Sequence, residues 1–183
     1  MITQPRSRVT GIALVVSLGL VVTGGAISRI AGLRLNDSVS MPRGLYRVEP
    51  LDGPLQRGEV VTVCPPMGMA MLDAIQRDYV PHGDCEGGFA PLVKPVGAVP
   101  GDEVTLTPGG IDVNGEAIPN TAQLVADSAG RPLHAMPPMT YKVAAGQVWL
   151  IANFSEKSFD SRYFGPVPIA AVMSRARPVW TAP

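Results

Sequence analysis

The chain has 183 residues, which is enough for one domain and one further short segment. Its 15 Lys and Arg residues balance 15 Asp and Glu residues, and the basic residues do not cluster. We therefore predict no nucleic-acid partner. Only 16% of the residues are charged, whereas 20 Gly and 19 Pro residues interrupt the chain. This mixture is typical of short strands joined by turns and argues against a helical bundle.

The first predicted element is a membrane-spanning helix. Residues 9–28 contain no charged side chain, and a helix of that length rises about 30 Å, the thickness of the hydrocarbon core. Two arginines lie near each end of the run, so the short N-terminal flank decides the orientation. We expect residues 1–28 to be a cytoplasmic tip and anchor, and residues 29–183 to form an external domain. A cleaved signal peptide is the main alternative, and a buried core helix is another.

The two cysteines fit an external domain. In an oxidising compartment, Cys64 and Cys85 would form one disulfide that closes a loop of about 20 residues and contributes roughly 3 kcal/mol. Two buried thiols are one alternative. A zinc site with His82 and His134 is another, but the spacing of the four residues matches no compact ligand pattern. We therefore predict a disulfide and no metal site.

Residues 59–63 are the first predicted strand of the external domain, because β-branched side chains dominate the run. An amphipathic helix is predicted next, at residues 67–80. Its apolar side consists of Met71, Leu72, Ile75 and Tyr79. Residues 92–99 then predict an apolar strand with a single lysine, which ends at a Pro-Gly-Asp turn.

The later segments continue the strand pattern. Residues 103–107 and 111–113 predict two strands, and Asn114-Gly115 is a hairpin turn signal. Residues 119–139 are rich in proline and irregular, so we predict an insertion or a lid there. Two further strands are predicted at 141–143 and 147–152. The whole pattern indicates a mainly β domain, built from a coiled antiparallel sheet, behind one N-terminal helix.

One lysine lies in an apolar setting. Lys94 is surrounded in sequence by Leu, Val and Pro residues, without a nearby acidic residue. Burial of a lysine on such a strand lowers its pKa toward neutrality, so that the neutral amine can act as a general base. An edge lysine whose ammonium reaches water is the alternative. A Ser-His-Asp triad has little support, because both histidines lie in loop-like segments and no Gly-x-Ser-x-Gly motif is present.

A nucleophile to match this lysine has to be a hydroxyl group on a tight turn. The segment Asn-Asp-Ser-Val-Ser-Met-Pro offers Ser38 and Ser40, shortly after the predicted anchor. A plain turn explains these residue types equally well. On local sequence alone, neither the serines nor the lysine establishes an active site.

Taken together, three blocks of the sequence resemble the bacterial type I signal peptidase family, and most closely its TraF-type conjugative transfer peptidases. The first block is Ser40-Met41-Pro42 followed by Gly-Leu-Tyr-Arg, the second runs over residues 94–102, and the third over residues 153–165. The resemblance implies a signal-peptidase-like β fold over most of the chain, with variable insertions near 64–90 and 114–140. It implies no cofactor.

By motif, the resemblance implies roles for four residues. Ser40 corresponds to the nucleophile and Lys94 to its general base. Ser38 occupies the place of the side-chain donor to the oxyanion, and Ser158 corresponds to the hydroxyl that orients the lysine. Ordinary signal peptidases have two residues between serine and proline, whereas here only Met41 intervenes, as in the TraF type. This shorter spacing leaves Ser38 open as an alternative nucleophile.

The resemblance also implies that Asp160 and Arg162 form a supporting ion pair. We expect their role to be structural, because an unbalanced charge beside Lys94 would change the pKa of the lysine.

The function implied by the resemblance is cleavage of a membrane-tethered precursor, such as a conjugative pilin, with either hydrolysis or cyclisation of the product. The expected location is the bacterial inner membrane, with one pass through the lipid and the catalytic domain in the periplasm. Two alternatives remain: a general type I signal peptidase that removes signal peptides, and a non-catalytic assembly factor of a pilus or secretion machine.

Overall fold

The computed structural model describes residues 32–182 of the chain. The predicted anchor, residues 9–28, lies outside them. Within the described residues, no helix combines the length and the apolar character that crossing a membrane requires. These residues form a mainly β structure with antiparallel sheets, which confirms the mainly β, antiparallel part of the predicted fold class.

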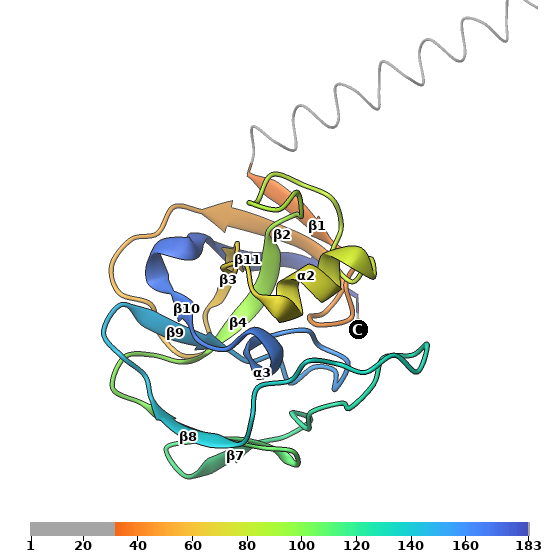
Figure 1. Cartoon of the computed structure of the whole chain (residues 1–183). Helices are drawn as coiled ribbons and strands as arrows, with labels where there is room; N and C mark the ends of the chain where they lie inside the picture. The colour runs from red at the N-terminus through yellow and green to blue at the C-terminus, as the bar shows by residue number, and fades with distance from the viewer. Residues whose placement is uncertain (1–31, 183) are drawn as a thin grey trace, which may run out of the picture.

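Seven strands form the larger sheet, in the order β1-β2-β11-β3-β4-β9-β10, and each neighbouring pair is antiparallel (Figure 1). The strands are β1 (Leu33–Asn36), β2 (Gly44–Glu49), β3 (Val60–Val63), β4 (Leu92–Ala98), β9 (Gln147–Leu150), β10 (Val167–Pro168) and β11 (Val172–Thr181). The last strand, β11, lies between β2 and β3, so the two ends of the described chain are joined in one sheet.

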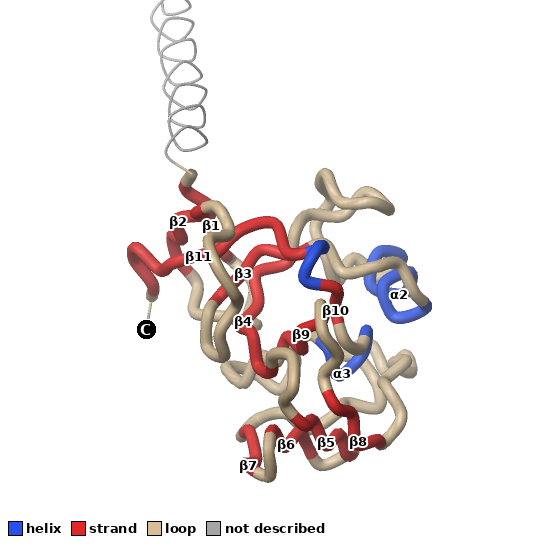
Figure 2. Tube along the Cα trace, turned by 90° about the vertical axis from the view of Figure 1, so that its left-hand side faces the viewer, coloured by secondary structure: helices blue, strands red, loops and turns tan. Residues whose placement is uncertain are grey.

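Four strands form the smaller sheet, in the order β7-β6-β5-β8. They are β5 (Glu103–Thr107), β6 (Gly110–Val113), β7 (Glu116–Ile118) and β8 (Met139–Lys142). Asn114 and Gly115 connect β6 to β7 with φ angles of 54° and 81°, as the predicted hairpin turn requires. Figure 2 shows this sheet at the opposite end of the molecule from β1 and β2.

Two apolar clusters hold the sheets together, and β9 contributes to both. Val148 and Leu150 pack in the larger cluster, beneath the seven-stranded sheet. Trp149 packs in the smaller cluster, with Val104 and Ile111 of the four-stranded sheet. Because side chains alternate along a strand, β9 joins the two sheets through its opposite faces.

One helix, α2 (Met69–Gln76), packs against the larger cluster. It is shorter than the predicted helix at 67–80, because the chain leaves helical geometry at Arg77 and Asp78 has a φ of 56°. The predicted apolar side was partly wrong: Met71 is buried, but Leu72 is 43% exposed. Ala74 takes the buried position in its place. Two short helical turns, α3 (Ser161–Phe164) and a 3-10 turn (Ile169–Ala171), follow β9.

Candidate active site

The four residues matched to catalytic roles line one cavity. This cavity has a volume of about 940 Å³, and Ser38, Ser40, Lys94 and Ser158 all contribute to its wall. They come from three segments far apart in sequence, namely the β1–β2 loop, strand β4 and the loop before α3. The fold therefore brings the predicted site residues together.

Ser40 lies in the middle of the loop between β1 and β2. The last paired residues of these strands are Asn36 and Gly44, so residues 37–43 form the connection. Ser40 is only 6% exposed, although it lines the cavity. Gly44 has a φ of 154°, and a Cβ atom there would lie 2.1 Å from the backbone oxygen of Trp180 on β11. The loop thus ends at a point where only glycine fits.

Lys94 points from β4 into the interior. Alternate residues of this strand are buried, and Lys94 itself is only 4% exposed. Its Nζ donates a hydrogen bond to Ser158 Oγ over 3.2 Å. Burial lowers the pKa of Lys94 to about 8, while the charges of Asp160 and Arg162 act in opposite directions, the first raising and the second lowering it. At pH 7 a lysine with this pKa is mostly charged, and roughly a tenth of it is neutral, far more than for an ordinary lysine.

Asp160 and Arg162 form a completely buried ion pair, with 2.8 Å between Asp160 Oδ1 and Arg162 Nε. Asp160 is also the N-cap of α3, and its carboxylate accepts from the backbone N–H of Arg162 and of Ala152. Arg162 Nη2 donates to the carbonyl oxygen of Ser158 over 2.9 Å. The pair thus fixes the backbone that carries the Ser158 hydroxyl, as a structural role requires.

Ser40 and Lys94 line the same cavity without a hydrogen bond between their side chains among the described residues. Such bonds are often long in the absence of substrate and shorten when a substrate binds. The cavity therefore contains two groups that could react together, the hydroxyl of Ser40 and the amine of Lys94, whose pKa is lowered.

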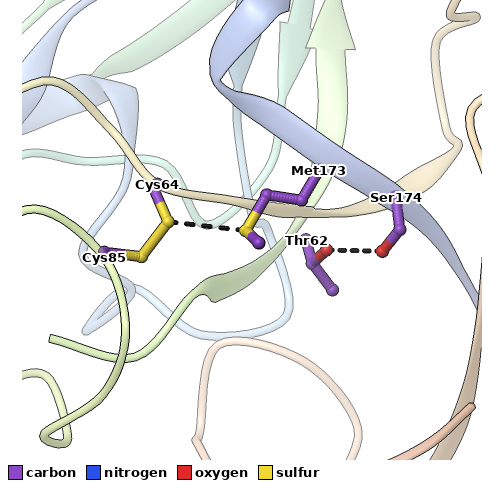
Figure 3. Close-up of a disulfide and its surroundings, with 5 residues drawn as sticks. All are labelled: Thr62, Cys64, Cys85, Met173 and Ser174. Atoms are coloured by element: carbon purple, nitrogen blue, oxygen red, sulfur yellow. Dashed lines mark hydrogen bonds between the residues drawn. A yellow bond between two sulfur atoms is a disulfide. The ribbon is translucent and has the colours of Figure 1, made fainter.

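Cys64 and Cys85 form the predicted disulfide. Figure 3 shows the side chain of Met173 reaching toward this bond, with its Sδ 3.5 Å from Cys64 Sγ. In the same view, the hydroxyls of Thr62 and Ser174 are joined by a hydrogen bond. Thr62, Met173 and Ser174 all line the cavity, so the disulfide lies behind one part of the cavity wall.

Segments 64–90 and 119–139, the two predicted insertions, also contribute to the wall. Tyr79 donates a hydrogen bond to the Asp127 carboxylate, and both residues line the cavity. Arg131 Nε lies 2.6 Å from the same carboxylate. The pKa of Asp127 is far below its usual value, first because of the Tyr79 hydrogen bond, so Asp127 stays ionised. These contacts join the two insertions into one surface.

Two functional candidates escaped the sequence analysis. Asn36 forms hydrogen bonds with residues 37–43, the loop that carries Ser38 and Ser40 (the serine loop), and Asp127 lines the cavity. An Asn placed just before a turn is a known signal for local side-chain to backbone hydrogen bonds, so Asn36 could have been proposed from sequence. Asp127 could not, because it reaches the cavity through a contact with Tyr79, 48 residues away.

Comparisons with known proteins agree with these observations. The family model described as signal peptidase, peptidase S26, matches residues 6–181. The plasmid transfer protein TraF of Escherichia coli is 38% identical over 162 residues, covering 88% of this chain and 89% of that protein. The conjugal transfer protein TraF of Agrobacterium fabrum is 40% identical over 165 residues, covering 89% and 91%.

A crystal structure of a signal peptidase I from Enterococcus faecalis aligns with a TM-score of 0.38 at 18% identity, covering 67% of this chain and 97% of that chain. This structural overlap is too loose to add to the sequence matches. The sequence matches themselves confirm the resemblance predicted from the three blocks.

Proposed function

The chain belongs to the peptidase S26 family of signal peptidases, and we propose that it is a serine endopeptidase with a Ser40–Lys94 catalytic pair. One observation supports this proposal above the others. Lys94 is buried, its pKa is lowered to about 8, and it lines the same cavity as Ser40. A lysine in such surroundings is costly for a purely structural protein, whereas a general base needs it.

In the proposed acylation step, neutral Lys94 Nζ accepts the proton of Ser40 Oγ while that oxygen attacks the carbonyl carbon of the scissile bond. The C–N bond then breaks, and the departing amine takes the proton from Lys94. The acyl part of the substrate remains as an ester on Ser40. The hydrogen bond from Lys94 to Ser158 (3.2 Å) supports this role, because it fixes the direction of the amine.

The carbonyl oxygen acquires negative charge in this step and needs donors. The backbone N–H of Ser40 and the Ser38 hydroxyl are the proposed donors, since Ser38 lines the cavity two residues before the nucleophile. A donor of this kind commonly contributes about 3 kcal/mol to stabilising the transition state. The ester is then attacked by water, or by an amine of the substrate, and the proton passes through Lys94 back to Ser40.

The proposed substrate is a membrane-tethered precursor, such as a conjugative pilin. The relatives named plasmid or conjugal transfer proteins support a role in conjugation. We propose further that residues 1–28 anchor the chain in the bacterial inner membrane and place the catalytic domain in the periplasm. The Cys64–Cys85 disulfide supports such an external location, because disulfides persist in oxidising compartments.

The test is processing of a co-expressed pilin precursor, followed by mass spectrometry. We expect Ser40→Ala and Lys94→Ala to abolish processing and Ser38→Ala to reduce it, whereas Lys142→Ala, which removes an exposed lysine of β8, keeps it. The product mass distinguishes hydrolysis from cyclisation. Full processing by both Ser40→Ala and Lys94→Ala would leave a non-catalytic assembly role as the better account. Equal processing of unrelated secretory precursors would indicate a general signal peptidase.

The pH dependence tests the base separately. Because the pKa of Lys94 is about 8, kcat/KM is expected to rise roughly tenfold per pH unit below that value and to level off above it. Lys94→Arg should be inactive at every pH, because a guanidinium group stays protonated. A wild-type profile that is flat from pH 6 to pH 9 would contradict the assignment of Lys94 as the base.

A further inference from the structure

We propose that Asn36 is a positioning residue for the reaction, because its side chain holds both the backbone around Ser40 and the hydroxyl of Ser38. The inference rests on the proposed function, since it assigns Asn36 a part in the same site. Asn36 is the last residue of β1, it is 7% exposed, and it lines the cavity.

Every polar atom of the Asn36 side chain is used within the serine loop. Its Nδ2 donates to the carbonyl oxygens of Met41 and Pro42, over 3.3 Å and 3.2 Å. Its Oδ1 accepts a hydrogen bond from Ser38 Oγ over 2.8 Å. One side chain therefore binds the loop on both sides of Ser40, and the two donors and the acceptor are all satisfied.

The network itself fixes the orientation of the amide. If the nitrogen and the oxygen of Asn36 exchanged places, the oxygen would face two carbonyl oxygens, of Met41 and Pro42, and no proton would lie between them. The orientation with Nδ2 toward the carbonyls and Oδ1 toward Ser38 is the one that the partners allow.

A second side chain supports the same loop from the neighbouring strand. Tyr46 on β2 is 1% exposed, and its hydroxyl donates to the Pro42 carbonyl over 2.8 Å. The Pro42 carbonyl therefore accepts hydrogen bonds from both strands of the hairpin, from Asn36 on β1 and from Tyr46 on β2. Tyr46 holds one end of the loop only, whereas Asn36 also reaches Ser38.

This arrangement matters for the reaction because Ser38 has a single proton to donate. In the structure that proton points to the neutral amide oxygen of Asn36. A developing oxyanion is a stronger acceptor than a neutral amide oxygen, so the proton turns to the substrate only as the negative charge appears. Asn36 thus holds Ser38 Oγ in place beside the proposed oxyanion position. When the oxyanion forms, only the hydroxyl proton of Ser38 has to rotate.

The two functions of Asn36 predict the effects of two variants. Asn36→Ala removes both donors to the loop and the acceptor for Ser38, and we expect kcat to fall about thirtyfold to a hundredfold. Asn36→Asp keeps the acceptor for Ser38 but places a carboxylate oxygen against the carbonyl oxygens of Met41 and Pro42, so we expect kcat to fall at least as far. KM should stay within about twofold in both variants, because Asn36 acts through Ser38 and Ser40.

A double-mutant cycle and a control variant separate positioning from a purely structural role. In a Ser38→Ala background, Asn36→Ala should lower kcat by a smaller factor than it does in the wild-type background, because the contact with Ser38 is already absent. The control is Asn114→Gly, which removes side-chain bonds to Glu103 N and Asp102 Oδ1 in the smaller sheet. We expect it to lower the melting temperature of the full chain without lowering kcat.

The assay uses the precursor that the wild-type chain processes, with Ser40→Ala measured alongside. If Ser40→Ala abolishes processing while Asn36→Ala keeps kcat within twofold of wild type, the Asn36 inference fails and the proposed function stands. If the factors by which Asn36→Ala and Ser38→Ala lower kcat simply multiply in the double variant, Asn36 does not act through Ser38 and this part of the inference is wrong. If Ser40→Ala retains processing, the proposed function itself fails, and the inference fails with it.

Discussion

The cavity is built from two kinds of structure. Its strand-borne part carries Lys94 on β4, and Ser38 and Ser40 on the loop that connects the paired strands β1 and β2. Its insertion-borne part comes from segments 64–90 and 119–139, the predicted insertions, which contain the one disulfide and are joined by the Tyr79–Asp127 contact. We therefore expect the proposed chemistry to depend on the sheet and its hairpin loop, and the shape of the wall to depend on the disulfide and on this contact.

Arg162 connects the two parts. Besides its ion pair with Asp160, it donates to the carbonyl of Ser158 and, over 3.0 Å, to the carbonyl of Ala122 in segment 119–139. In the other direction, the Arg162 carbonyl accepts from the backbone N–H of Met136 over 2.9 Å. A disturbance at Arg162 is therefore expected to reach both parts of the cavity.

The largest effect is expected at the strand-borne part, from Lys94→Met. Processing should fall by about a thousandfold or more, since the proposed base is lost. At pH 7 the free energy of unfolding should rise by up to about 3 kcal/mol, the equivalent of shifting a lysine pKa from 10.5 to about 8. The sign follows from proton binding: below pH 8 the buried lysine is charged at a cost, and this cost disappears between pH 8 and 10.5.

Urea unfolding of the full chain in detergent, at pH 7 and at pH 10, measures this effect. The stability of the wild type should rise with pH over that interval relative to Lys94→Met, and Lys142→Met serves as the exposed-lysine control. A Lys94→Met variant that is less stable than wild type at pH 7 would show that burial of this lysine costs little.

Arg162→Met is expected to have the next largest effect. It leaves the Asp160 carboxylate buried without its partner, which typically costs 3–5 kcal/mol. Because Arg162 also lowers the pKa of Lys94, the midpoint of the pH–rate profile should move to higher pH in whatever fraction remains folded. Urea unfolding and the pH profile measure both effects. The double variant Asp160→Asn/Arg162→Met should recover part of the stability, and no recovery would argue against charge as the cause.

The disulfide tests the insertion-borne part alone. Cys64→Ala/Cys85→Ala removes a link between residues 21 apart in sequence and should lower the free energy of unfolding by about 3 kcal/mol. We expect KM to rise several-fold while kcat changes little, because the proposed catalytic pair, Ser40 and Lys94, lies outside segments 64–90 and 119–139. Dithiothreitol should affect the wild type in the same way and leave the double variant unchanged. A kcat loss as large as that of Lys94→Met would remove the distinction between the two parts.

Tyr79→Phe is expected to have the smallest effect. It deletes only the hydroxyl that donates to Asp127, so segment 119–139 should be cut faster by added protease, by about threefold to tenfold, with kcat unaltered. The control is Tyr141→Phe, which removes the hydroxyl that donates to Gln147 near the smaller sheet and leaves both insertions untouched. Equal cleavage rates in Tyr79→Phe and wild type would mean that other contacts hold the insertions together.

The parts of the fold that could be predicted from sequence are those with local signals. The six predicted strands agree with β3 to β6, β8 and β9 to within two residues at each end, because alternation and turn residues mark them. Strands β1, β2, β7, β10 and β11 were not predicted. Strand β11 contains Pro178 and two arginines, and much of it is exposed, so its place between β2 and β3 is decided by partners far away in sequence.

The candidate site shows the same division. Lys94 could be singled out because a lysine between apolar residues is unusual. Ser158 carries no such signal, and only resemblance to the family indicated it. Its hydrogen bond with Lys94 joins residues 64 apart. The position of Asn36 before a turn indicates local hydrogen bonds, but its partners, the carbonyls of Met41 and Pro42, follow only from the register of the β1–β2 hairpin.

Under the external location proposed above, the Cys64–Cys85 bond also has a consequence for when the proposed peptidase would become active. Thiols in a reducing cytosol stay unpaired, so a chain still in the cytosol would lack the bond behind Met173 and Thr62. The wall of the cavity would then be incomplete. Coupling the last step of assembly to oxidation would delay full activity until after export and would protect proteins of the cytosol from premature cleavage.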